Sequence, residues 1–301
     1  MAKSDIQIVN DAFIEFGGTI FQQNILNWDL GGDGIQMRTN VNAPQALTKL
    51  SSTGAPQPYR SQDDFAGNGA KYTDRTLTAY QSKWDFEFDN EDFRNTYLAS
   101  KALQEKSLYA AALDFLSNKY KEHLKSKAFY SGVRNAIGVA PVDVANGWGT
   151  IIAAEILAGA LVPIVTGVLT AADAVTKVEA LLESAAIPTW LRELGGTIYC
   201  SYATFDKYCK HYRVLNTYGF KADLTGEYKI DNKNFSLKPV SWMGTSARLI
   251  VTLANNLVMG TDADRIEVYP TTHLNIIQTR LMMPVGFEIQ DLEAIFVNDQ
   301  V

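Results

Sequence analysis

The sequence predicts an α+β protein with an N-terminal arm, an extended hairpin loop, one long helix and a compact α/β unit. Three observations lead to this prediction. Residues 31–73 are rich in turn-forming residues and precede a strand pattern at 75–89. One long helical pattern covers 91–128. Helix and strand patterns then alternate over about 151–260, as expected for mixed layers of helix and sheet.

The composition bounds the class of protein before any motif is considered. The chain has 301 residues, of which 47% are hydrophobic and 20% charged, enough for a real core and typical of a globular protein. Its formal charge is −6, so no overall basic character indicates nucleic-acid binding. Cys200 and Cys209 are the only cysteines, which excludes a disulfide framework and fits a reducing compartment.

The first 73 residues predict an N-terminal arm followed by a long irregular segment. Residues 1–30 form the arm, with one short amphipathic helix indicated by Ile8, Phe13 and Phe16. Residues 31–73 show no sustained helical period, which is unusual inside a compact domain. Either the segment is disordered, or it extends away and finds its contacts elsewhere. The strand pattern that follows favours an extended loop.

That strand pattern covers residues 75–89 and alternates strictly. A period of two places alternate side chains on one face of a strand. We therefore predict the return leg of a long hairpin, with these residues on one face: Thr78, Tyr80, Ser82, Trp84, Phe86 and Phe88.

The long helix is predicted at about 91–128. Acidic residues and Asn at 89–92 suit a helix start, and Ser131-Gly132 suits its end. Apolar residues recur at spacings of three and four, which predicts one buried stripe. The stripe comprises Tyr109, Ala112, Leu113, Leu116, Tyr120 and Leu124.

The apolar stretch at 151–170 has nearly the length of a membrane span. Glu155 lies within it, and an ionisable group at membrane depth is costly. Pro163 and Gly167 also interrupt the stretch. We predict instead a short buried helix at 151–161, a strand at 162–166 and a turn.

The remaining elements of the second unit follow in order. Thr170 and Asp173 open an amphipathic helix with a stripe at 175–182. A buried strand is expected at 196–201 and a helix at 203–215. Further strands are expected in "FSLKPVSWMG" and "ARLIVTLANNLVMG", and in the tail, 262–301.

No motif passes the tests for a ligand or a catalyst. Asp262 and Asp264 could begin a calcium loop, but the sixth position is Glu267 and the twelfth is His273, where Gly and Glu are required. Residues 67–71 lack the spacing of a phosphate loop. Cys200 and His211 fit a buried structural cysteine and a helix-surface histidine better than a catalytic pair. We expect no enzyme, no cofactor and no metal site.

The order of the parts resembles the major capsid proteins of tailed bacteriophages, which have the Hong Kong 97 fold. The residues that carry the likeness are "RTLTAYQSKWDFEFDNEDFRNTYL", the long helix running to "AFYSG", and "LIVTLANNLVMGTDADRIEVY" with the ending "MMPVGFEIQDLEAIFV". The resemblance implies that "NNLVMGTD" is a crossing between domains. It divides the chain into an arm (1–30), an extended loop (31–85), a peripheral domain with the long helix (86–150), an axial domain (151–261) and a return to the peripheral domain (262–301).

The resemblance also implies a function and partners. The expected function is a shell subunit that forms hexamers and pentamers around double-stranded DNA in the virion, after assembly in the bacterial cytoplasm. The alternative is an encapsulin-like compartment around a cargo enzyme. A portal is implied, and a scaffolding protein, if present, would be separate. DNA would be enclosed without sequence-specific binding, and no membrane is involved.

Four residues are candidates for contacts between subunits or for anchoring the loop: Lys71, Trp84, Phe86 and Phe88. Lys71 is the only plausible crosslinking lysine near the loop tip. No asparagine partner can be assigned to it, so crosslinking is not predicted.

Overall fold

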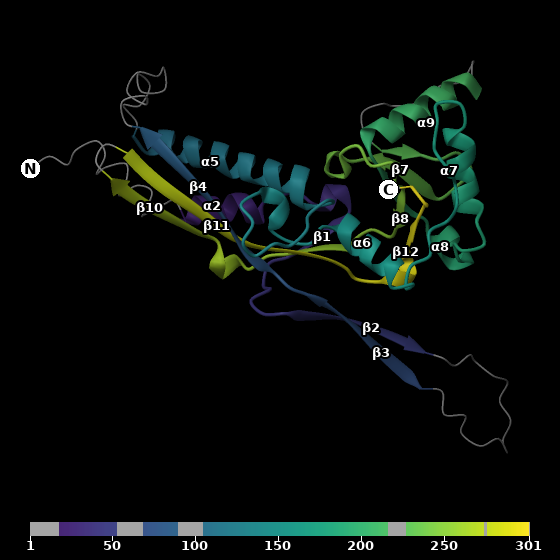
Figure 1. Cartoon of the computed structure of the whole chain (residues 1–301), viewed down its shortest axis with the longest axis horizontal. Coiled ribbons are helices and arrows are strands. Elements are labelled where there is room, and N and C mark those ends of the chain that lie inside the picture. The colour runs from purple at the N-terminus through teal and green to yellow at the C-terminus, as the bar shows by residue number, and fades with distance from the viewer. Residues whose placement is uncertain (1–17, 53–68, 90–104, 216–226, 274–275, 301) are drawn as a thin grey trace, which may run out of the picture.

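The computed structural model describes residues 18–52, 69–89, 105–215, 227–273 and 276–300. Figure 1 shows an elongated body with a long helix-and-sheet part at one end and a compact part at the other. A two-stranded hairpin projects from the body between them. Within the described ranges, no helix is both long and apolar enough to cross a membrane.

The long part is built on a twisted sheet organised around its longest strand, β11. Residues 276–285 of β11 pair with β4, its first half also pairs with β10, and its last four residues pair with β9. β9 pairs in parallel with β1. One continuous strand therefore joins the outer end of the body to its centre. The strands are β1 (Ile35–Arg38), β4 (Tyr80–Asp89), β9 (Leu257–Gly260), β10 (Glu267–His273) and β11 (Ile276–Ile289).

Helix α5 (Glu105–His123) runs along this sheet, and α2 (Gly18–Leu26) packs against α5. A π-helical turn at Leu124–Ala128 continues α5. The predicted stripe is confirmed where its side chains are described, because Leu113, Leu116, Tyr120 and Leu124 are buried. The side chains of Tyr109 and Ala112, and residues 90–104, lie outside the described part. Sequence analysis missed α2, and its arm helix around Ile8, Phe13 and Phe16 also lies outside that part.

The compact part is a second sheet with helices packed on it. Strand β5 is central, parallel to β7 and antiparallel to β8, and the order is β12-β8-β5-β7-β6. The predicted strand at 196–201 and the helices near 174–183 and 203–215 are confirmed. The strands are β5 (Gly196–Cys200), β6 (Tyr228–Lys229), β7 (Phe235–Pro239), β8 (Ile250–Thr252) and β12 (Ile295–Val297), and the helices are α7 (Ala174–Glu183), α8 (Thr189–Leu194) and α9 (Tyr202–Leu215).

A cluster of aromatic rings joins the two parts. Trp148, at the start of α6 (Trp148–Leu157), lies with its ring centroid 5.3 Å from Phe129, 5.3 Å from Trp242 and 5.2 Å from Phe287. These rings come from the end of the long helix, the compact part and β11. All are buried, and edge-to-face packing of this kind contributes beyond area burial.

The turn before β1 docks on the compact part. Tyr199 of β5 donates a hydrogen bond of 2.6 Å to the carbonyl of Asp33. Gly34 has φ +73°, and a Cβ there would lie 2.5 Å from the Tyr199 hydroxyl. Only glycine fits both the left-handed backbone and the close approach.

Two predictions for residues 31–89 were wrong in detail. Residues 35–38 belong to the body, because β1 pairs with apolar β9, so the projecting hairpin is shorter than the segment 31–73. Its strands are β2 (Gln45–Ser52) and β3 (Ala70–Leu77). The run 75–89 is split between β3 and β4 at Thr78 and Ala79. The chain bends there over Gly286, where a Cβ would meet the carbonyl oxygen of Thr78 at 2.1 Å.

The predictions for 151–170 were also wrong. Helix α6 buries Trp148 and Ile152 but leaves Leu157 exposed, so it is a surface helix. The expected strand at 162–166 is only a single bridge between Ile164 and Asn298. Apolar composition alone predicted burial, and the tertiary structure left one side of the segment uncovered.

The segments "FSLKPVSWMG" and "ARLIVTLANNLVMG" do not each form one strand as predicted. Strand β7 ends at Pro239 and a 3-10 turn follows at Ser241–Met243. "ARLIVTLANNLVMG" forms two strands, β8 and β9, separated by a turn in which Asn255 has φ +65°. The tail strands are confirmed as β10, β11 and β12.

Candidate functional site: the projecting hairpin and its base

The hairpin has two faces with different partners. Lys49 pairs with Thr73 and Leu50 with Tyr72 across the two strands, so neighbouring residues point to opposite sides. The inner face holds Leu47, Lys49 and Arg75, whose side chains contact the body. The outer face turns away from it.

A small apolar cluster begins the attachment. Val41, Leu47, Leu77 and Val258 are buried against one another where the hairpin leaves the body. Gly260 permits this approach, because a Cβ there would lie 2.9 Å from the Leu77 side chain. The cluster fixes the first residues of the hairpin.

Arg75 extends the attachment through two carboxylates. Its Nη2 lies 2.6 Å from Glu288 in β11 and 2.8 Å from Glu155 in α6. Burial of Arg75 opposes its charged form, but the two carboxylates outweigh that effect and raise the pKa of Arg75. This contact explains Glu155, the charged residue inside the apolar stretch.

Lys49 forms a matching contact from the other strand. Its Nζ lies 2.8 Å from Asp291 and 2.6 Å from Glu293, in the segment that follows β11. Burial opposes the charge here as well, and the carboxylates raise the pKa of Lys49. The hairpin base is thus held by one cation on each strand. Sequence analysis missed Lys49 and Arg75, because their acidic partners lie far away in the chain.

The outer face carries an exposed apolar pair. Leu50 and Tyr72 lie directly opposite each other and are 60% and 69% exposed. A Leu and an aromatic side chain held together in solvent on a projecting ribbon suit burial against another molecule. No local pattern identifies Leu50, because Leu47 and Leu50 are three residues apart and lie on opposite faces of β2.

The four residues proposed from the sequence do not form one cluster. Lys71 lies in β3 and is exposed, near the end of the described hairpin. Trp84 and Phe86 lie in β4, half-buried on the side facing α5, and the Trp84 ring lies 6.2 Å from Tyr120. Phe88 pairs with Ile277 through the backbone, and its side chain lies outside the described part.

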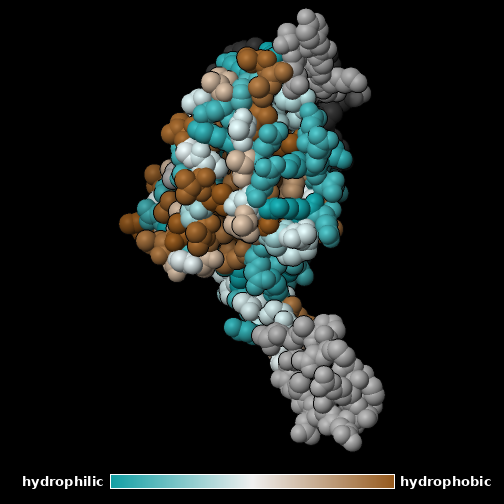
Figure 2. Space-filling view, turned by 90° about the vertical axis from the view of Figure 1, so that its right-hand side faces the viewer, coloured by the Kyte–Doolittle hydropathy of each residue, from teal (hydrophilic) through white to brown (hydrophobic). Residues whose placement is uncertain are grey.

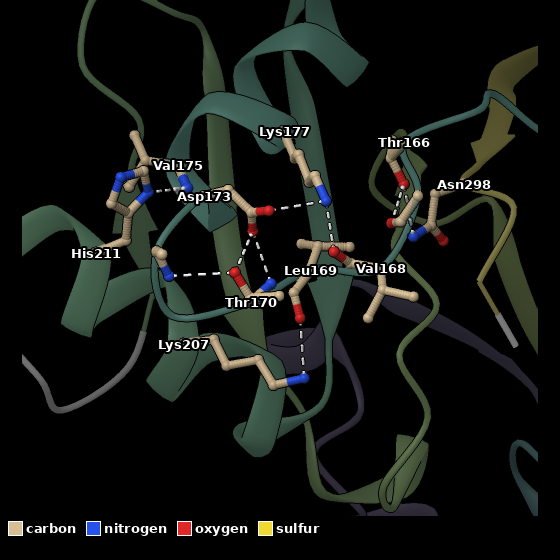
Figure 3. A network of polar contacts seen from close by, with 12 residues as sticks. Thr166, Val168, Leu169, Thr170, Asp173, Val175, Lys177, Lys207, His211 and Asn298 are labelled. Carbon is tan, nitrogen blue, oxygen red and sulfur yellow. Dashed lines mark hydrogen bonds and ion pairs between the residues drawn. The ribbon is translucent and has the colours of Figure 1, made fainter.

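Cys200 and His211 do not form a catalytic pair. Burial raises the pKa of the Cys200 thiol, which opposes formation of a reactive thiolate. The prediction of a helix-surface histidine was wrong, because His211 is buried and its Nδ1 accepts a 3.0 Å hydrogen bond from the Val175 N–H (Figure 3). That contact satisfies a free donor in the first turn of α7.

The same network orders the approach to α7. Asp173 accepts from Thr170 and pairs with Lys177 at 2.9 Å (Figure 3). The bond from Lys177, assisted by Thr170, lowers the pKa of Asp173 to about 2. These polar groups are occupied in holding the turn and helix together. No group of three or more metal-ligating side chains occurs among the described residues.

The crossing at residues 259–262 connects strand to turn. Asp262 caps a short 3-10 turn, accepting from the Asp264 N–H at 3.3 Å. The Thr261 N–H bonds to the carbonyl of Arg38, so the crossing also pairs with the chain next to β1. Residues 259–262 lead from β9 to β10 within the long part. The passage from the compact sheet to the long sheet lies earlier, at residues 253–256 between β8 and β9, so only the first residues of the predicted crossing "NNLVMGTD" take part in it.

Comparison with known proteins found relatives at the level of structure. No family model and no curated protein matches the sequence. A chain from the procapsid of satellite phage P4, which includes the size determination (Sid) protein, aligns over 99% of this chain and 91% of that chain, with TM-score 0.57 and 14% identity. A chain from the capsid of the empty GTA particle aligns over 88% and 87%, with TM-score 0.53 and 13% identity. One from the native GTA particle aligns over 88% of each chain, with TM-score 0.51 and 10% identity. This likeness over most of the chain shows that the protein has the fold of these capsid chains, in agreement with the Hong Kong 97 fold that its sequence resembles.

Proposed function

We propose that this protein is a major capsid protein, which self-assembles into the icosahedral head shell around the double-stranded DNA of a tailed bacteriophage. The observation that carries the proposal is the fold shared with chains of the P4 procapsid and the GTA capsid along nearly the whole length. In this role the protein is a structural component of the virion and needs neither catalysis nor a cofactor.

The hairpin supports a role in assembly. Its inner face is held to the body, and the outward pair Leu50 and Tyr72 is left uncovered. We infer that the hairpin lies over a neighbouring copy, with Lys71 near the contact. Trp84, Phe86 and Phe88 would anchor the return leg of the loop on the peripheral domain, through the pairing of β4 with β11.

The division into domains is part of the proposal. The proposed division keeps an arm (1–30), a peripheral domain (86–150), an axial domain (151–261) and a return segment (262–301). Within the expected extended loop (31–85), the projecting part is limited to the hairpin of β2 and β3. Pairing of β10 and β11 with β4 supports joining the return segment to the peripheral domain. A shell built from one chain needs closed rings, and the resemblance to phage capsid proteins implies that these rings are hexamers and pentamers. A portal is the expected partner, and a scaffolding protein, where one is used, would be separate.

Purified particles from the native source test the function. Electron microscopy should show closed shells, and the ratio of absorbance at 260 nm to that at 280 nm should indicate packaged nucleic acid. Shells with the absorbance of protein alone, containing a second protein, would favour the encapsulin-like alternative. A protein that stays monomeric at high concentration, in the presence of its own virion components, would contradict both.

A further inference from the structure

An uncharged apolar strip lies on the surface between α6 and α7. Four aliphatic side chains are largely exposed: Leu157 (91%), Val162 (76%), Val165 (84%) and Val168 (62%). Residues 156–172 contain no charged side chain. Figure 2 shows hydrophobic residues gathered on one side of the body above the projecting hairpin, with hydrophilic residues on the other side. The sequence predicted burial here, and neither the fold nor the hairpin contacts explain the exposure.

The body holds this strip in place. The Ile164 N–H bonds to the carbonyl of Val297 at 2.8 Å, and the Asp299 N–H bonds to the carbonyl of Ile164 at 3.0 Å. Leu161 and Leu169 are buried on either side of the exposed valines. The aliphatic side chains are therefore presented from an anchored backbone, which lowers the entropy lost when a partner covers them.

The strip adjoins the base of the hairpin. Glu155, which pairs with Arg75 of the hairpin at 2.8 Å, precedes Leu157 by two residues. Figure 1 shows the hairpin leaving the body next to α6. The strip therefore begins close to the residues that hold the base of the hairpin.

Charge favours a second copy of this chain as the occupant. Each copy carries a formal charge of −6, so two copies repel each other in general. An uncharged apolar surface is where two such copies can approach with the least electrostatic cost and with the largest gain from removing apolar area from water.

We propose that the strip Leu157, Val162, Val165 and Val168 is an intersubunit surface, covered by a second copy of this chain. The inference rests on the proposed function, because it requires assembly of many copies. In a closed ring each copy presents its strip to one neighbour.

Charge substitution in the strip tests the proposal. V165D and V162D should fold with the wild-type melting temperature, because both side chains are exposed. The fraction of subunits in particles should fall by about tenfold or more, as expected when a charge is buried unpaired in an interface. V165T, of nearly the same shape and without charge, should assemble nearly as well as wild type. Wild-type levels of assembly by both Asp variants would overturn the inference.

Cysteine labelling gives a second, independent measurement. Cys200 and Cys209 are buried, so a cysteine at V165C would be the accessible thiol among the described residues. It should react readily in dissociated subunits and be protected about tenfold or more in assembled particles, given the exclusion of water at an interface core. Equal labelling rates in the two states would overturn the inference while leaving capsid assembly intact. Failure of the wild-type protein to assemble at all would instead count against the proposed function.

Discussion

His211 belongs to a residue type that often acts in catalysis, but here its buried side chain holds two helices together. Its Nδ1 accepts a hydrogen bond from the Val175 N–H at the start of α7, so a polar contact joins α9 to α7 within the compact part. An acceptor at this point must be unprotonated, which fixes the tautomer with the proton on Nε2.

The first prediction follows from that contact. H211A should lower the free energy of unfolding by about 1–3 kcal/mol, because the buried Val175 N–H loses its acceptor. Assembly of the folded subunit should be unchanged. Urea unfolding measures the first effect and electron microscopy the second. K210A, at an exposed position on the same helix, is the control. A folded H211A subunit that does not assemble would show a role in assembly.

Trp84 provides the second prediction at this scale. Its ring lies 6.0 Å from Phe86, 6.2 Å from Tyr120 and 5.7 Å from His123. It is half-buried, so W84A should cost about 1.5–3 kcal/mol, less than the 3–5 kcal/mol typical of a fully buried aromatic. Thermal and urea unfolding would measure this loss. K83A, whose side chain points to the opposite face, should change stability little.

At the scale of elements, the hairpin is held by a few contacts confined to its base. The apolar cluster is small, and the cations Lys49 and Arg75 each bring together two carboxylates from the body. Each cation thus also suppresses repulsion between two acids. The orientation of the hairpin depends on these two residues.

Arg75 carries the third prediction. R75Q should destabilise the protein by about 1–3 kcal/mol, since it leaves Glu155 and Glu288 partly buried without a cation. The double variant R75Q/E155Q should recover part of the loss, because one of the two carboxylates is then neutral. A double-mutant comparison of urea unfolding measures this coupling. Losses in R75Q and E155Q that add up in the double variant would show that Arg75 and Glu155 do not interact measurably.

At the scale of the whole molecule, the hairpin separates folding from assembly. Lys49 and Thr73 lie opposite each other, so residues 50–72 can be replaced by an Asn-Gly turn without disturbing the base. The deletion keeps Leu47, Lys49 and Arg75. It removes Leu50, Tyr72 and the residues between them.

The fourth prediction concerns this shortened protein. The subunit should stay folded, with a melting temperature close to that of wild type, because shortening a loop lowers closure entropy and none of the described residues that are removed is buried. Shell formation should fail, since the removed contacts lie between subunits. Sedimentation and electron microscopy test assembly, and circular dichroism tests folding. Unfolding of the shortened subunit would show that residues 50–72 stabilise their own subunit.

The sequence by itself determined the elements with strong local periodicity. The stripe from Leu113 to Leu124, the cap and stripe of α7 and helix α9 follow from spacing, because each of these helices exposes one face to solvent and buries the other. Strand β5 follows instead from its short apolar run, which is buried on both faces. The order of these elements also indicated the fold.

The tertiary structure alone decided which surfaces face another part of the chain. The helix at 151–161 was expected to be buried because it is apolar, but burial requires a covering layer, and none of the described residues covers Leu157. Val162 and Val165, in the segment expected as a strand, are exposed as well. The partners of Arg75 are 80 and 213 residues away in the chain, beyond the reach of any local pattern. The split between β3 and β4 likewise depends on the distant Gly286. Local periodicity fixes the faces of each element, whereas contacts between distant residues determine what each face meets.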